Sequence, residues 1–192
     1  MEGKENKMSI LFENPGKENT QAALEAAVAA AKEHQLAIVV ATGSGETALK
    51  LREIADQKGY DGALIAVTLS AGASKVDVHE LGEKLRAHGI IPVTTTHALS
   101  AGERSVKEHC GGTYPLTLTA DVLRFFGQGM KVTVEIATMA ADTGAIPGGQ
   151  PVVAVGGSSH GSDTVVILTP AYSSNLLETK VHEIIAKPGL YE

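Results

Sequence analysis

The sequence predicts an α/β protein whose central sheet is covered by helices on both faces. Short apolar runs rich in β-branched residues alternate along the chain with longer segments of helical periodicity. The runs are apolar at nearly every position, which is typical of strands that are buried on both faces of a sheet. Glycine-rich turns separate the two kinds of segment. Together these features favour one layered α/β fold.

The length and composition narrow the class further. A chain of 192 residues suits one domain, expected over residues 10–192 after a loose N-terminus at residues 1–9. Sixteen Lys and Arg against 22 Asp and Glu give a net charge of −6, which argues against a nucleic-acid partner. No segment has the pattern of a secretory signal or the roughly 18 apolar residues of a membrane span. The single Cys110 cannot form an internal disulfide, so a cytoplasmic protein is expected. A homo-oligomer is compatible with all of this.

The first half of the chain opens with an Ala-rich helix over residues 20–34. Either Asn19 or Thr20 can cap it, because a side-chain oxygen there accepts a hydrogen bond from the first turn. Pro92 lies in the last strand of this half, and it lacks the N–H that a central ladder needs. That strand is therefore expected at a sheet edge. The elements that follow the first helix are strand 36–42, helix 45–58, strand 63–69, helix 77–88 and strand 90–94.

The second half contains one ambiguous segment, residues 129–143. Val132, Val134 and Ile136 alternate as in a strand, but the length of the segment and the stop at Gly144 favour a helix. A short connection between the last two buried strands allows them to pair antiparallel. The other elements expected here are helices 102–109 and 117–126, strands 152–156 and 164–169, and an added edge strand at 181–187.

The predicted fold also places a ligand site. In such sheets, ligands bind beyond the carboxyl ends of the strands, at the point where the strand order reverses. A helix that precedes a strand begins at this same edge. Five segments are therefore expected to converge there: residues 17–20, 42–47, 96–104, 127–129 and 156–160.

The segment Thr42-Gly43-Ser44-Gly45-Glu46-Thr47 joins a buried strand to a helix. Its two glycines allow backbone N–H groups to face a ligand, and the helix N-terminus adds positive potential, so the segment is predicted to bind a phosphate. The alternative is a tight glycine turn with a serine cap. The segment also matches G-x-G-x-x-A, but no acidic residue ends the second strand, which argues against a dinucleotide. No Walker-type loop is present.

Three further side chains are candidates for this site. His97 and Arg104 bracket a Ser100-x-x-Glu103 capping box and are predicted to contact the ligand, whereas His34, His88 and His182 should lie elsewhere. Glu135 is the lone charge among apolar neighbours in its helix. It is either on a solvated face, or it lies near the ligand, where it pairs with Arg104 or Lys17 or accepts a hydrogen bond from the ligand.

No metal site is predicted. No nucleophile–base pair stands out either, and a Ser–His–acid set from Ser158 or Ser159, His160 and Asp163 is very local in sequence.

Several motifs resemble those of stand-alone proteins related to the C-terminal α/β domain of pyruvate kinase. The resemblance covers residues 14–187 and implies a three-layer α/β/α fold. Its mixed five-stranded sheet would have the order 3-2-1-4-5, with strand 5 antiparallel. Pyruvate kinase activity is not implied, because its active site lies in a separate barrel domain of roughly 250 residues. The matching segments are PGKENT (15–20), SGETA (44–48), THALS (96–100), ER (103–104), FGQG (126–129), VEIA (134–137) and GG (156–157).

The resemblance also implies a ligand. In pyruvate kinase the domain holds an allosteric sugar bisphosphate on a Thr-x-Ser-Gly-x-Ser/Thr loop, which Thr42, Ser44, Gly45 and Thr47 match. Glu46 departs from that loop, where a basic residue is common. Stand-alone relatives are associated with FMN, which has one phosphate, so FMN is the expected ligand. The alternative is an enzyme, either a flavin-dependent oxidoreductase or a hydrolase of a phosphorylated metabolite. The expected contacts are Thr42, Gly43, Ser44, Gly45, Glu46, Thr47, Thr96, His97, Arg104, Gln128, Gly129, Glu135, Gly156 and Gly157.

Overall fold

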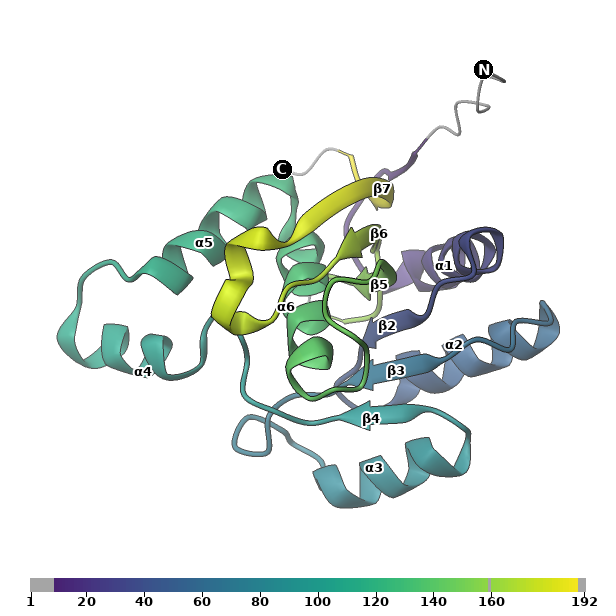
Figure 1. The fold of residues 1–192 in the computed structure, drawn as a ribbon, viewed down its shortest axis with the longest axis horizontal. Coiled ribbons are helices and arrows are strands. Elements are labelled where there is room, and N and C mark those ends of the chain that lie inside the picture. Colours follow the sequence, from purple (N-terminus) through teal and green to yellow (C-terminus); the bar gives the residue numbers. More distant parts are fainter. Residues whose placement is uncertain (1–8, 159, 190–192) are drawn as a thin grey trace.

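The computed structural model describes residues 9–158 and 160–189 as a mixed sheet with helices on both faces (Figure 1). The expectation of a loose N-terminus falls on residues that lie, except for residue 9, outside this described part. Seven strands form the sheet in the order β1-β7-β6-β5-β2-β3-β4. They are β1 (Ile10–Phe12), β2 (Ile38–Ala41), β3 (Leu64–Val67), β4 (Ile91–Val93), β5 (Val152–Gly156), β6 (Thr164–Thr169) and β7 (Lys180–Pro188).

The sheet corrects the prediction of five strands. The strands expected in the order 3-2-1-4-5 are β4-β3-β2-β5-β6, which are adjacent as expected, but β7 and β1 extend the sheet beyond β6. The order 3-2-1-4-5 is therefore wrong for the whole sheet. β6 pairs antiparallel with both β5 and β7, as the resemblance implied for strand 5, and the remaining pairs are parallel. β7 is not an edge strand, because β1 pairs with its far side.

The two faces of the sheet carry separate apolar cores. Successive residues of a strand point to opposite faces, so Ile38 and Val40 of β2 join one core and Val39 joins the other. The first core lies under α1 (Thr20–His34), α2 (Glu46–Gln57) and α3 (Val78–Ala87). The second lies under α6 (Gln128–Asp142) and part of α5 (Pro115–Leu123). Figure 1 shows these helices on either side of the sheet, which confirms the helix–sheet–helix layers.

The ambiguous segment 129–143 is a helix, as its length predicted. α6 is buried along most of its length, and Gly144 follows it with a φ of 74°. Apolar residues on several sides of α6 produced the strand-like alternation, because this helix packs on the sheet and is also covered by α5. No helix in the described part of the chain is both long and apolar enough to cross a membrane.

Two predicted helix caps are wrong. Asn19 donates its amide to Asn14 O, and Thr20 Oγ1 accepts from the N–H of Ser162, so neither side chain caps α1. Glu103 does not form a capping box with Ser100 at the start of α4 (Ala101–Cys110). Its carboxylate instead accepts hydrogen bonds from the N–H groups of Leu116 and Thr117. Glu103 thus satisfies the first turn of α5 and joins it to α4.

The prediction for Pro92 is confirmed. β4 is an edge strand that pairs only with β3, and Pro92 stands opposite Ala66 in that ladder. Because an edge strand leaves one row of backbone groups unpaired, the missing N–H of proline is tolerated.

Two glycines allow α6 to approach the strands closely. A Cβ on Gly129 would lie 2.0 Å from Thr164 Oγ1, and one on Gly156 would lie 2.7 Å from Gly129 O. Neither position has room for a side chain. The start of α6 is thereby held directly against β5 and β6.

Gly129→Ala is expected to destabilise the protein by about 1–3 kcal/mol, because the added methyl group overpacks a site closed by the side chains of Thr164 and Asp163. Gly102→Ala is the matched control, since nothing lies within 4 Å of its Cβ position on the exposed surface of α4. The control should be neutral or slightly stabilising. Urea unfolding of both variants measures the difference, and equal stabilities would contradict the close packing.

Candidate functional site

A cleft of about 740 Å³ opens at the carboxyl ends of β2 and β3. β2 lies between β3 and β5, so the chain leaves β2 to one side of the sheet and returns to β5 on the other. This is the switch point at which a ligand was predicted. Five segments line the cleft: the β2–α2 loop (residues 42–45) with the first turn of α2, the β3–α3 connection, residues 97–104, α6, and the β5–β6 loop.

Most of the predicted site residues come together in this cleft. Those that line it are Thr42, Gly43, Ser44, Glu46, Thr47, His97, Arg104, Gln128, Glu135 and Gly157. His160 also lines it, whereas His34, His88 and His182 do not, as predicted. Four of the five segments expected to converge therefore line the cleft. Residues 17–20 do not line it, but they pack against the β5–β6 loop at the same edge: Thr20 Oγ1 accepts from the N–H of Ser162, and a Cβ on Gly161 would lie 2.7 Å from Lys17 Cα.

The other four predicted residues are near the cleft but do not line it. Gly45, Gly129 and Gly156 have packing roles: a Cβ on Gly45 would lie 2.6 Å from Leu81 Cδ1, and the other two hold α6 against the sheet. Thr96 is exposed to solvent. Glycines at such positions mark close backbone approach, and the sequence pattern alone does not distinguish approach to a ligand from approach to a helix.

The β2–α2 loop lines the cleft with residues whose backbone N–H groups are partly unpaired. The N–H of Thr42 continues the sheet by donating to Val67 O, and the N–H of Gly45 donates to Thr42 Oγ1 at 3.0 Å. Among the described residues, no hydrogen-bond acceptor serves the N–H groups of Gly43, Ser44 and Thr47. These groups stand at the start of a 12-residue helix, where the helix dipole favours an anion.

The charges around the cleft favour an anion as well. Lys75, Arg104 and Lys131 line it against two carboxylates, Glu46 and Glu135, although the whole chain has a net charge of −6. A locally positive cleft in an acidic protein raises the local concentration of anionic ligands.

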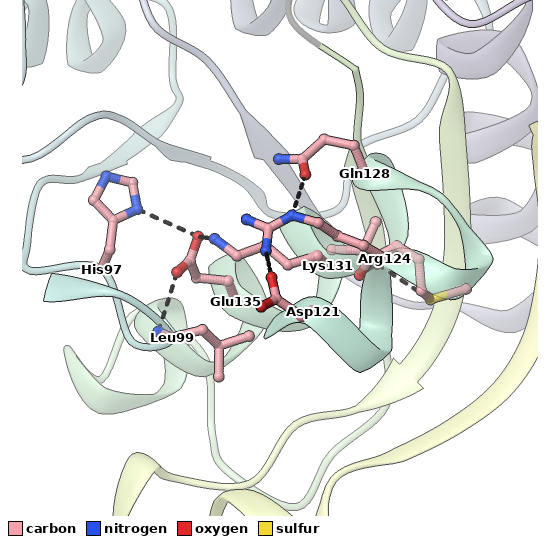
Figure 2. Close-up of polar contacts among 9 residues, drawn as sticks. His97, Leu99, Asp121, Arg124, Gln128, Lys131 and Glu135 are labelled. Atoms are coloured by element: carbon pink, nitrogen blue, oxygen red, sulfur yellow. Dashed lines mark hydrogen bonds and ion pairs between the residues drawn. The ribbon is translucent and has the colours of Figure 1, made fainter. Parts of the chain in front are cut away.

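The carboxylate of Glu135 is buried in the wall of the cleft, where three donors meet it (Figure 2). Oε1 accepts from the N–H of Leu99 at 3.0 Å. Oε2 accepts from Lys131 Nζ at 2.5 Å and from His97 Nδ1 at 3.3 Å. The alternative of a solvated helix face is wrong, because only 3% of Glu135 is exposed. The predicted partners Arg104 and Lys17 are wrong too.

The sequence contained a signal for the correct partner. Lys131 and Glu135 are four residues apart, the spacing at which two side chains meet on a helix. The predicted partners of Glu135 lie on other segments, whereas its actual partner, Lys131, lies on the same helix. His97 was predicted for the cleft, but its contact with Glu135 depends on how the segment after β4 packs against α6.

Two of the three donors, His97 and Lys131, decide the charge state of Glu135. Burial alone would raise its pKa, but the hydrogen bond from His97 and the positive charge of Lys131 outweigh burial and lower the pKa to about 2. Burial lowers the pKa of Lys131, an effect that Glu135 opposes. The pair is therefore ionised and mutually dependent, because either charge alone would be buried without compensation.

Part of the cleft is apolar. Two polar residues that line the cleft beside this apolar part, Thr68 and Lys75, were not predicted as site residues. They lie in the β3–α3 connection, which carries no recognisable motif. The apolar side chains that line the cleft are Val67, Leu69, Val76, Val132 and Ile136. The cleft thus combines donors for an anion with surface for a flat or apolar group.

Asp163 holds the β5–β6 loop, which lines the cleft, in place. This buried carboxylate accepts from the N–H groups of Gly16 and Ser158, both at 3.1 Å, and from Thr164 Oγ1 at 2.8 Å. It therefore ties the β5–β6 loop to the chain before α1 and has no contact with His160 among the described residues. The Ser–His–acid alternative has no support here, and Ser159 lies outside the described part of the chain.

Within the described part of the chain, no three His, Cys, Asp or Glu side chains gather as a metal site requires.

The layered mixed sheet, with a cleft at its switch point, defines an α/β domain. The family model described as "Pyruvate kinase, alpha/beta domain" matches residues 21–168. The chain belongs to this family, as its motifs indicated.

Glu135→Gln keeps the shape of the side chain but removes its charge. The free energy of unfolding is expected to fall by about 3–5 kcal/mol at neutral pH, because the charge of Lys131 stays buried without a partner. The folded-state pKa of Glu135 is depressed, so its stabilisation is complete above pH 4.5 and is lost as the pH falls toward 2. The difference between variant and wild type should therefore shrink over that range in urea unfolding.

Glu83→Gln is the matched control, since Glu83 is an exposed carboxylate on α3. It should unfold like the wild type at neutral pH. If both glutamine variants have the stability of the wild type, the Glu135 carboxylate does not hold the cleft wall.

Proposed function

We propose that the protein binds a phosphorylated small molecule in the cleft at the carboxyl edge of its sheet. The observation that carries the proposal is that Gly43, Ser44 and Thr47 line the cleft and that their N–H groups have no protein acceptor among the described residues. A phosphate accepts several such hydrogen bonds at once and gains from the helix dipole behind them. The hydroxyls of Thr42, Ser44 and Thr47 add further polar groups to the same loop.

FMN is the leading candidate for this ligand. A cleft of about 740 Å³ has the size of small-molecule sites, and its apolar side chains offer a surface for a ring system. In this arrangement the β2–α2 loop would hold the phosphate, and Val67, Val132 and Ile136 would contact the ring. Bound FMN would supply hydride and electron transfer.

Glu46 argues for a single phosphate. Its carboxylate lines the cleft one residue before Thr47, at the helix start that would receive the phosphate. A second phosphate nearby would meet this negative charge. A monophosphate therefore fits the loop better than a sugar bisphosphate.

A second candidate function is an enzyme acting on the bound molecule, either a flavin-dependent oxidoreductase or a hydrolase of a phosphorylated metabolite. The contact between His97 and Glu135 favours it, because a histidine held by a carboxylate is a common arrangement in acid–base catalysis.

Ser44→Asp is expected to weaken FMN binding at least 100-fold, since a fixed carboxylate would repel the phosphate and compete for its donors. Quenching of flavin fluorescence on titration with protein measures the affinity. Ser174→Asp, in the 3-10 helix η3 (Ser173–Glu178), introduces the same charge outside the cleft lining and should bind like the wild type.

Riboflavin, which lacks the phosphate, provides an independent comparison. It should bind wild-type protein at least tenfold more weakly than FMN, because charge-assisted hydrogen bonds contribute roughly 1.5–3 kcal/mol each. Equal affinities for FMN and riboflavin would contradict a phosphate site on the β2–α2 loop.

A further inference from the structure

We propose that His97 is a proton-accepting residue of the cleft, held in one tautomer by Glu135, and that it contacts the end of the ligand remote from the phosphate. This inference rests on the proposed function for the identity of the site. It adds an acid–base role that binding alone does not require.

The tautomer follows from the hydrogen bonds of Glu135. A carboxylate that already accepts from Lys131 Nζ and from the N–H of Leu99 has only acceptor positions left. The nearest ring atom of His97 is Nδ1, at 3.3 Å from Oε2. Nδ1 must therefore carry the hydrogen and donate it. In the neutral ring this leaves the lone pair on Nε2.

The free nitrogen is accessible. Figure 2 shows the second ring nitrogen of His97 on the side of the ring that faces away from Glu135. The histidine lines the cleft, and a quarter of its side chain is exposed, against 4% for the Glu135 side chain. Nε2 is therefore free to meet a ligand, while Glu135 remains buried as a positioning residue.

The chemistry of such a pair is the movement of one proton. The Nε2 lone pair takes a proton from an acidic O–H, N–H or C–H group of the ligand, which keeps the bonding electrons as an anion. The ring becomes an imidazolium whose charge the Glu135 carboxylate stabilises. Arg104, which lines the same cleft, is available to offset the new negative charge on the ligand. The ligand class is thus a phosphorylated small molecule with an acidic proton at its far end.

The tautomer can be measured directly in the wild-type protein. Proton–nitrogen NMR correlation of ¹⁵N-histidine protein above pH 8 should show His97 as the Nδ1–H form. His34 is the internal control, because it is exposed and has no contact with a carboxylate in the described structure. It should show the Nε2–H form that a free imidazole prefers. Resonances are assigned by His97→Gln and His34→Gln, and Glu135→Gln should remove the preference at His97 if that variant folds. An Nε2–H form of His97 in the wild type would overturn the proposal.

Acylation by diethyl pyrocarbonate, followed by mass spectrometry, tests the position of Nε2 relative to the ligand. FMN at concentrations that saturate fluorescence quenching should slow acylation of His97 at least tenfold and leave His34 unchanged. Saturating FMN without protection of His97 would overturn the contact with the ligand. Failure of FMN to bind would count against FMN in the proposed function, while the tautomer measurement would still decide the state of His97.

Discussion

The buried carboxylate of Glu135 is the interaction on which the cleft depends. It receives hydrogen bonds from Leu99, His97 and Lys131, and so joins the segment after the edge strand β4 to the central helix α6. The two segments are far apart in sequence, and both line the cleft together with the β2–α2 loop. Removing either Glu135 or Lys131 leaves the other charge buried without compensation, so the two side chains stabilise the fold only as a pair. The hydrogen bond between His97 and Glu135 also fixes the orientation of the imidazole ring.

The β2–α2 loop contributes backbone donors to the cleft that it lines. Thr42 Oγ1 accepts from the N–H of Gly45 and closes the turn, which leaves the N–H groups of Gly43, Ser44 and Thr47 at the start of α2. Such donors do not titrate, and their position is fixed by a buried strand and a helix. A charged ligand held there would lie across the sheet edge from an oriented histidine. This juxtaposition of a fixed anion site and an acid–base group is the reason for proposing more than passive binding.

The sequence predicted the features that depend on local pattern. Periodicity located the main strands and α6, Pro92 located the sheet edge, and the glycine spacing located the loop that lines the cleft. The missed features depend on tertiary contacts. β1 has only three residues, too few for any periodicity, so it was not predicted, and β7 was expected at the edge that β1 occupies. Glu103 has the spacing of a capping box but reaches the next helix instead. Gly129 and Gly156 were expected to contact a ligand, and the structure shows that they allow α6 to pack closely on the sheet. A glycine in a sequence indicates a close backbone approach, but it does not indicate which group approaches.

The most direct test of the central claim is an amide NMR titration of the ¹⁵N-labelled protein with FMN, repeated with inorganic phosphate. Both ligands are expected to shift the backbone N–H resonances of Gly43, Ser44 and Thr47 downfield, as hydrogen bonds to phosphate form. Only FMN should also perturb Val132 and Ile136 on α6, where the ring is expected to lie. Shifts confined to residues outside the cleft, or the absence of any shift at the β2–α2 loop with saturating ligand, would contradict this claim.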